Sequence, residues 1–199
     1  MKTLNVPAFF RSPGFIVAAM FIAAGPSQGE GLDPLLDDFS DAQNNSLGIQ
    51  RQFVDDTSVG GNTTTETRVT DGVLNVRGEI SPARGQPGWS SSVQLLDPQG
   101  LPRDLSGFDG VRLRMKITAG MVSVSANSTE VTNFDYHAAM VVVKTDGAFH
   151  EVKIPFESMK RAWSEQTPLN TSSIASLSIV AFGVQKGAYD FELDEVGFY

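Results

Sequence analysis

The sequence predicts an all-β fold, a jelly-roll sandwich of two antiparallel sheets, and three observations support this class. Short segments with strand composition recur along the chain, separated by clusters of Gly, Pro, Asn and Asp. Residues 111–117 alternate strictly between apolar and basic side chains, which is the period of a half-buried strand. Helical patterns are scarce: only residues 156–163, after Pro155, could form one short helical turn. Many short strands at regular spacing are typical of such sandwiches.

The other predicted strands follow one another with turn residues between them. These segments are 73–80, 91–96, 136–143, 149–154 and 173–184. Residues 145–147, Thr-Asp-Gly, suit a hairpin turn between two of the strands. Near the C-terminus, Phe191 and Leu193 keep a period of two, whereas Val196 and Phe198 resume it one residue out of phase. We therefore expect a β-bulge at residues 194–195, because a bulge inserts one extra residue into a strand.

Length, charge and composition narrow the function. The 199 residues suit one domain with a real core. The net charge of −8 disfavours nucleic acid as a partner, since that affinity rests on Lys and Arg neutralising phosphates. The chain has no cysteine, which excludes disulfides, thiolate metal sites and cysteine nucleophiles.

The N-terminus is typical of a secretory signal. Lys2 and Arg11 precede an apolar run at residues 14–25, which is too short to span a bilayer comfortably because that needs about 20 residues. We expect residues 1–25 to be the signal peptide, 26–35 a flexible leader, and 36–199 the folded domain. Cleavage would lower the net charge to −10, leave no transmembrane segment, and place the protein in the periplasm or outside the cell. An uncleaved anchor is the alternative.

The stretch from Phe53 to Val69 combines paired acids with a Gly-Gly pair. Its spacing partly fits an EF-hand loop, but Val59 falls at a ligand position and no helix flanks the stretch. No Gly-Lys-Ser/Thr follows, so it is not a phosphate loop. We interpret it as a turn into a strand, with the acids holding the loop and the glycines allowing positive φ. A loop that contacts a partner is the alternative, and it would use Asp55, Asp56, Gly60, Gly61 and Asn62.

An open sheet face could bind a glycan. If the apolar residues of 111–117 face the core, the basic ones line the opposite face, and side chains of another strand could join them. Aromatic rings and hydrogen-bonding groups are the usual components of such sites. The candidate ligand-binding residues are Arg112, Arg114, Tyr136, His137 and Trp89. The alternative is an ordinary solvated face.

We expect no enzymatic activity, and the alternative is a hydrolase that would use a pair of Asp or Glu side chains in a deep pocket. His137 and His150 are the only histidines, and neither lies in a Gly-x-Ser-x-Gly or His-Glu-x-x-His motif. We expect Trp163 to pack at the core or its rim, beside the predicted helical turn.

Several short segments of the chain resemble segments of a known family and occur in the same order. These segments are 37–41, 54–63, 73–80, 88–93, 104–115, 149–159 and 187–199. Together they resemble the family of complex I intermediate-associated protein 30, which is similar to the family-eleven carbohydrate-binding modules among the galactose-binding-like sandwiches. The resemblance implies a non-catalytic module that binds a partner protein. Because of the export signal, we expect an envelope or secreted adaptor; a carbohydrate-binding module acting alone is the alternative.

The resemblance also implies a possible structural Ca²⁺ where the first and last strands meet, although no cofactor is required. Ca²⁺ takes six to eight oxygen ligands, which carboxylates from distant segments can supply. The candidate ligands are Asp37, Asp38, Asp41, Asp194 and Glu195. The alternative is that these acids are simply solvated at strand ends.

Overall fold

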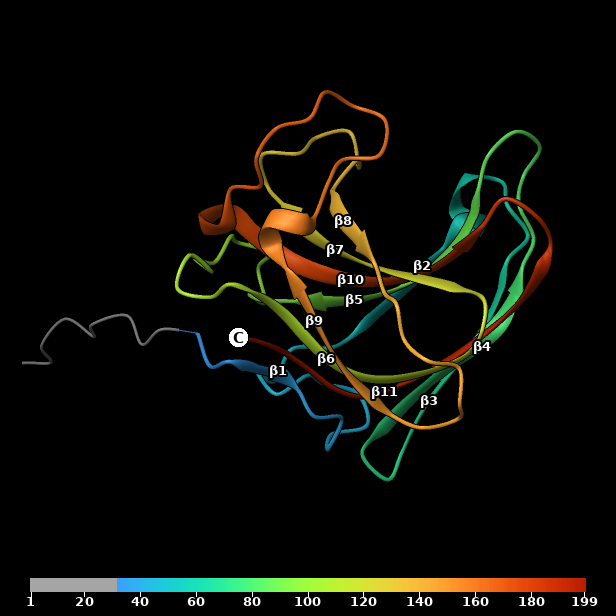
Figure 1. The fold of residues 1–199 in the computed structure, drawn as a ribbon, viewed down its shortest axis with the longest axis horizontal. Coiled ribbons are helices and arrows are strands. Elements are labelled where there is room, and N and C mark those ends of the chain that lie inside the picture. Colours follow the sequence, from blue (N-terminus) through green and yellow to red (C-terminus); the bar gives the residue numbers. More distant parts are fainter. Residues whose placement is uncertain (1–31) are drawn as a thin grey trace, which may run out of the picture. The chain divides into compact units, whose positions relative to one another are not determined.

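The computed structural model describes residues 32–199, which form two antiparallel sheets packed face to face (Figure 1). The six-stranded sheet consists of β1 (Leu35–Asp37), β3 (Thr64–Thr70), β4 (Val73–Ile80), β6 (Gly110–Ala119), β9 (His150–Pro155) and β11 (Gly187–Phe198). The five-stranded sheet consists of β2 (Gln52–Asp55), β5 (Gly88–Leu95), β7 (Met121–Ser128), β8 (His137–Met140) and β10 (Ile174–Gly183). The predicted all-β sandwich is confirmed.

The strand orders place β11 and β10 at the centres of the two sheets. The six-stranded sheet runs β3–β4–β11–β6–β9, with β1 paired to the end of β11, and the five-stranded sheet runs β2–β5–β10–β7–β8. In Figure 1 the first sheet is the lower layer and the second the upper one. The sandwich interior between them is filled mainly by apolar residues of alternating strand positions, but β5 contributes the buried polar side chains of Ser90, Ser92 and Gln94.

Helical structure in residues 32–199 is limited to three short 3-10 turns. These are η1 (Asp56–Val59), η2 (Phe156–Ser158) and η3 (Thr171–Ser173). The helical turn predicted over 156–163 is therefore only three residues long, because the chain returns to an extended conformation at Met159. Within the same residues, no helix has the length and apolar character needed to cross a membrane. The predicted signal peptide lies outside the described residues.

The alternation of β6 and the bulge of β11 are both confirmed. Val111, Leu113, Met115 and Ile117 all lie in the core, and the basic residues between them face outward. The register of β11 against β6 shifts between Leu193 and Glu195. As a result, two successive acidic side chains point outward, and apolar residues fill the core on both sides of the bulge.

The predicted hairpin around residues 145–147 is wrong. β8 ends at Met140 and belongs to the five-stranded sheet, whereas β9 begins at His150 in the six-stranded sheet. Residues 141–149 therefore connect the two layers instead of turning back within one. A run of apolar, β-branched residues predicts a strand. The sheet to which that strand belongs depends on its pairing with distant segments, which the local sequence does not show.

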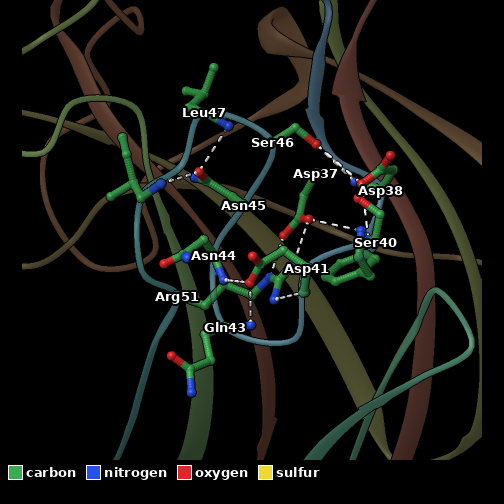
Figure 2. A network of polar contacts seen from close by, with 12 residues as sticks. Asp37, Asp38, Ser40, Asp41, Gln43, Asn44, Asn45, Ser46, Leu47 and Arg51 are labelled. Carbon is green, nitrogen blue, oxygen red and sulfur yellow. Dashed lines mark hydrogen bonds and ion pairs between the residues drawn. The ribbon is translucent and has the colours of Figure 1, made fainter.

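A buried ion pair joins the two layers at one edge (Figure 2). Arg51 precedes β2, and its Nε and Nη2 donate to the Asp37 carboxylate of β1 over 2.6 and 2.7 Å. The two side chains are 1% and 0% exposed. The guanidinium also stacks 4.9 Å from the Phe39 ring and donates to the Asp41 carbonyl oxygen. The pair thus fixes β1 to the strand that opens the other sheet.

Candidate functional site

The structure divides the predicted ligand-binding residues between the two sheets. Arg112 and Arg114 lie on the outer face of the six-stranded sheet, while Trp89 and Tyr136 belong to the five-stranded side. His137 faces the interior, and its Nε2 lies 2.7 Å from the Thr167 carbonyl oxygen. These residues therefore do not form one site, because neighbouring strands along the chain belong to different layers.

The two arginines are already paired with acids. Arg112 forms ion pairs with Glu195 and Glu151, and Arg114 pairs with Asp194. The bulge in β11 makes this possible by turning Asp194 and Glu195 to the same face. This face therefore consists of paired charges along the sheet, which matches the solvated-face alternative.

The five carboxylates predicted to share a calcium ion do not come together. Asp37 is held by Arg51, and Asp194 and Glu195 are held by arginines of β6. Residues 32–199 contain no group of three or more acidic or histidine side chains placed to hold a metal ion. Calcium binding remains a prediction, and a rise in the thermal midpoint with millimolar Ca²⁺ would support it.

Asp38 and Asp41 hold the turn that follows β1 (Figure 2). Asp38 accepts hydrogen bonds from the Ser40 hydroxyl and amide at 2.7 and 3.0 Å, and these bonds lower its pKa. Asp41 accepts from the amides of Asn44 and Gln43, each at 2.7 Å, and these bonds likewise lower its pKa. Both carboxylates are therefore occupied by local contacts.

The paired acids of residues 53–69 also hold their own loop. Asp55 caps η1 by accepting from the Thr57 amide at 3.1 Å. Asp56 is buried and accepts from the Thr63 amide and hydroxyl at 3.0 and 2.8 Å, and from the Trp89 amide at 3.3 Å. This geometry supports the interpretation of the stretch as a tied turn.

The glycines of the same loop have two different roles. Gly60 adopts φ = 90° at the end of η1, a conformation that favours glycine. Gly61 packs so closely on Asp56 that a Cβ atom would lie 2.1 Å from the carboxyl carbon. Of the predicted partner-contact residues, Gly60 and Asn62 are exposed and Asp56 and Gly61 are buried, so only the tip of the loop is open to a partner.

The outer face of the five-stranded sheet forms a different kind of surface. Val122, Val124 and Ala126 of β7 point into the core, so the residues between them point outward. Directly paired residues of antiparallel strands lie on the same side of the sheet. The cross-strand rows are Trp89–Phe182–Met121, Ser91–Val180–Ser123, Val93–Ser178–Ser125 and Leu95–Ser176–Asn127. We call these twelve residues the outer serine face.

Hydroxyl and amide groups in the two rows at the Asn127 end of this face bind one another. The Asn127 side-chain amide donates to the hydroxyls of Ser176 and Ser178 at 2.9 and 2.7 Å. Its oxygen accepts from Ser125 at 3.0 Å. Each serine hydroxyl keeps further hydrogen-bonding capacity, because a hydroxyl has one donor and two acceptor positions, but the four residues are only 6–7% exposed. The network fixes a band of polar groups between aromatic and aliphatic side chains.

The outer serine face is long and carries no charge. It extends from Trp89 to Leu95 along β5, six residue steps of about 3.3 Å, or roughly 20 Å. None of its residues is acidic or basic, although the chain has 15 basic and 23 acidic residues. This face was not predicted from the sequence, because residues 121–128 were not identified as a strand. The alternation of serine with Val and Ala at residues 122–126 was the available signal.

Two loops extend beyond the Asn127 end of the outer serine face. Residues 129–136 and 160–170 lie beside each other in the upper part of Figure 1. The buried Asp135 carboxylate joins them by accepting from three successive amides, those of Ala162, Trp163 and Ser164, at 2.7, 3.1 and 2.6 Å. Trp163 is 72% exposed, so the prediction that it packs at the core or its rim is wrong.

The Asp135 contacts predict an acid-sensitive contribution to stability. Burial alone would raise the pKa of this carboxyl, but hydrogen bonds from the Ser164 side chain and the three amides hold its pKa below the ordinary value of 3.8. The contribution is therefore complete above about pH 4 and lost as the pH falls through the lowered pKa.

We expect the difference in thermal midpoint between the wild type and Asp135→Asn to stay constant from pH 8 to 5 and to shrink below pH 4. Thermal unfolding followed by circular dichroism in a series of buffers measures this difference. A difference that already shrinks between pH 7 and 5 would contradict the assignment.

Comparison with known proteins gives one family and one fold. The profile of the family described as complex I intermediate-associated protein 30 matches residues 39–193. No curated protein matches the sequence.

Similar solved structures include carbohydrate-binding modules. The family 11 carbohydrate-binding module of the cellulosomal cellulase Lic26A-Cel5E of Clostridium thermocellum has 18% identity and a TM-score of 0.57, covering 82% of this chain and 92% of that chain. A family 11 module from the same organism, in complex with a β-1,3-1,4-mixed-linked tetrasaccharide, has 17% identity and a TM-score of 0.57, covering 83% and 94%. The agarase AgWH50C has 9% identity and a TM-score of 0.56, covering 83% of this chain but 26% of the enzyme. At these identities the likeness shows the fold alone.

Proposed function

The chain belongs to the complex I intermediate-associated protein 30 family, and we propose that it is an exported, non-catalytic binding module that holds a neutral glycan on its outer serine face. Export rests on the signal sequence expected at residues 1–25. The similarity to carbohydrate-binding modules supports a binding role for a sandwich of this fold.

The observation that carries this proposal is the uncharged band of hydroxyl and amide groups on the outer serine face. A sugar presents hydroxyls at its edges and apolar C–H groups on its ring faces. Ser176, Ser178 and Asn127 are only 6–7% exposed and form the polar floor of the face, where their remaining hydrogen-bonding positions would meet sugar hydroxyls, while the half-buried Trp89 and Phe182 offer aromatic surface to a ring. The absence of charge on this face suits a neutral ligand, and the negative net charge of the protein disfavours an acidic polysaccharide.

A partner protein is the second candidate ligand. The family is described by a protein associated with a complex I intermediate; Met121 of the face is exposed, and the exposed side chains of Met140 and Val54 border the face. Methionine and aromatic residues are enriched at protein interfaces, but serine is depleted there. The five serines of the outer serine face therefore favour the glycan.

The positions of the histidines support a non-catalytic role. His137 is buried and bonds to a backbone oxygen, while His150 Nε2 contacts the Asp146 carboxylate at 2.8 Å in the segment that connects the two sheets. Neither lies on the outer serine face, where a bound ligand would need an acid or base.

We expect the purified chain to bind neutral glycans on an array, and Trp89→Ala to weaken binding to the best ligand roughly tenfold, which is the effect of losing one aromatic contact. Isothermal titration with that glycan measures the change. Arg68→Ala, on the outer face of the other sheet, is the matched control and should change affinity less than twofold. Failure to bind any neutral glycan, or equal losses in both variants, would overturn the proposal.

A further inference from the structure

We propose that the two loops at residues 129–136 and 160–170 form an aromatic anchoring subsite, which stacks a terminal sugar of the same glycan on Phe134 and Trp163. This inference rests on the proposed function, because it assumes a ligand on the outer serine face. It extends that ligand beyond the sheet, onto side chains that the face itself does not include.

The first observation is that two large rings are exposed without contributing to the core. Phe134 is 78% exposed and Trp163 is 72% exposed. Phe134 also adopts φ = 61°, a left-handed conformation that is strained for a bulky residue. An exposed side chain on a strained backbone does not stabilise the fold. Strained residues of this kind cluster at functional sites.

The second observation is that the rings are held in place before any ligand arrives. Asp135 lies beside Phe134 in the chain, and its carboxylate binds the amide of Trp163 and those of both its neighbours. Asn133 adds two contacts across the same gap: its side-chain amide donates to the Ser164 hydroxyl at 2.9 Å, and its oxygen accepts from Arg161 at 3.0 Å. Preorganised contact residues lower the entropic cost of binding.

The third observation is continuity with the outer serine face. His137 pairs with Ala126, so the preceding Tyr136 directly follows the end of the pairing at Asn127, and its ring is half-buried there. The Tyr136 ring meets Phe134 edge to face, with centroids 6.3 Å apart. A ligand that lies along the hydroxyl network therefore reaches Tyr136 and then the exposed rings.

The polar groups around the rings favour a sugar over an apolar partner. Asn133, Arg161 and Gln166 all stand within the two loops, and Gln166 bonds to the Arg161 carbonyl oxygen at 2.8 Å. Single rings among planar polar groups match the mixed surface of a sugar, which has apolar faces and polar edges. A protein-binding hot spot would instead cluster its aromatic anchors within a well-packed apolar centre.

Titration with mixed-linkage β-1,3-1,4-gluco-oligosaccharides of increasing length tests this subsite. The wild type should gain affinity as the chain grows long enough to reach the loops. In Trp163→Ala and Phe134→Gly that gain should fall roughly tenfold, while the shortest oligosaccharide that binds the face should bind all three proteins equally.

A stability measurement separates loss of a contact from loss of fold. Phe134→Gly removes the positive-φ strain, so its free energy of unfolding should stay equal or rise while its affinity falls. Asp71→Gly relieves a similar strain, φ = 53° in the β3–β4 turn, and should leave affinity unchanged.

The failures of the two proposals differ. If Trp89→Ala weakens binding but both loop variants match the wild type at every length, the anchoring subsite is wrong and the glycan-binding face stands. If the wild type binds none of the oligosaccharides and no neutral glycan on the array, both proposals fail, and the exposed rings are left to a protein partner.

Discussion

Replacing Asp37 with alanine should lower the free energy of unfolding by about 3–5 kcal/mol. The substitution leaves the Arg51 guanidinium buried with no counter-charge, in a position where neither partner of the pair is more than 1% exposed. It also removes the acceptor of the Phe39 amide, which bonds to the same carboxylate at 2.9 Å. The loss of stability comes mainly from stranding one charge, since buried pairs as such contribute little.

Denaturant and thermal unfolding of three variants measure this cost. Asp37→Ala alone should shift the thermal midpoint downward by on the order of 10 °C. The double variant Asp37→Leu with Arg51→Met should recover most of the loss, because no charge is then left unpaired. Glu66→Ala breaks the exposed pair with Arg77, whose side chains are 73% and 68% exposed, and should cost less than about 1 kcal/mol. An Asp37→Ala variant whose free energy of unfolding lies within about 1 kcal/mol of the wild type would contradict the role of the pair.

Replacing Gly61 with alanine should lower the free energy of unfolding by about 3 kcal/mol or more. The new Cβ would lie 2.1 Å from the Asp56 carboxyl carbon, far inside contact distance, so one of the two must move. Moving Asp56 breaks its hydrogen bonds to Thr63 and to the Trp89 amide. Trp89 is a residue of the outer serine face, at the end opposite Asn127. The effect therefore combines overpacking with the loss of buried hydrogen bonds.

Gly107→Ala is the matched control for this substitution. No atom lies within 4 Å of a Cβ built at Gly107, and its φ is outside the left-handed region. We expect that variant to unfold within about 0.5 kcal/mol of the wild type. Equal stability of the Gly61 and Gly107 variants, measured by denaturant unfolding, would show that the loop is not packed as described.

Local periodicity made the strand and bulge predictions possible. The alternation at residues 111–117 and the phase slip at residues 194–195 are both properties of a single strand, so no knowledge of its partners is needed. The tie between Asp56 and its loop was also foreseeable, because acids beside glycines are common in turns. The full set of bonds to Asp56 was not, since the Trp89 amide comes from a distant strand.

Pairing across the sequence limited the prediction of the site. The sequence places Arg112 and Tyr136 in successive predicted strands, but Arg112 belongs to β6 and Tyr136 precedes β8, and these strands lie in opposite layers. The outer serine face combines three strands, and serine gives a weak strand signal because burial and pairing decide its place. The exposure of Trp163 was not predicted, because its backbone amide is held by the Asp135 carboxylate, almost thirty residues earlier in the chain.

The most direct test of the account is a residue-resolved map of glycan contact in solution. Backbone amide chemical shifts, recorded by NMR while a mixed-linkage β-glucan oligosaccharide is added, report which strands meet the ligand. We predict changes concentrated on β5, β7 and β10 and on the two loops beyond Asn127, with β6 and β11 unaffected. Changes concentrated on β6 and β11, or none at any concentration, would contradict the claim that the outer serine face binds a neutral glycan.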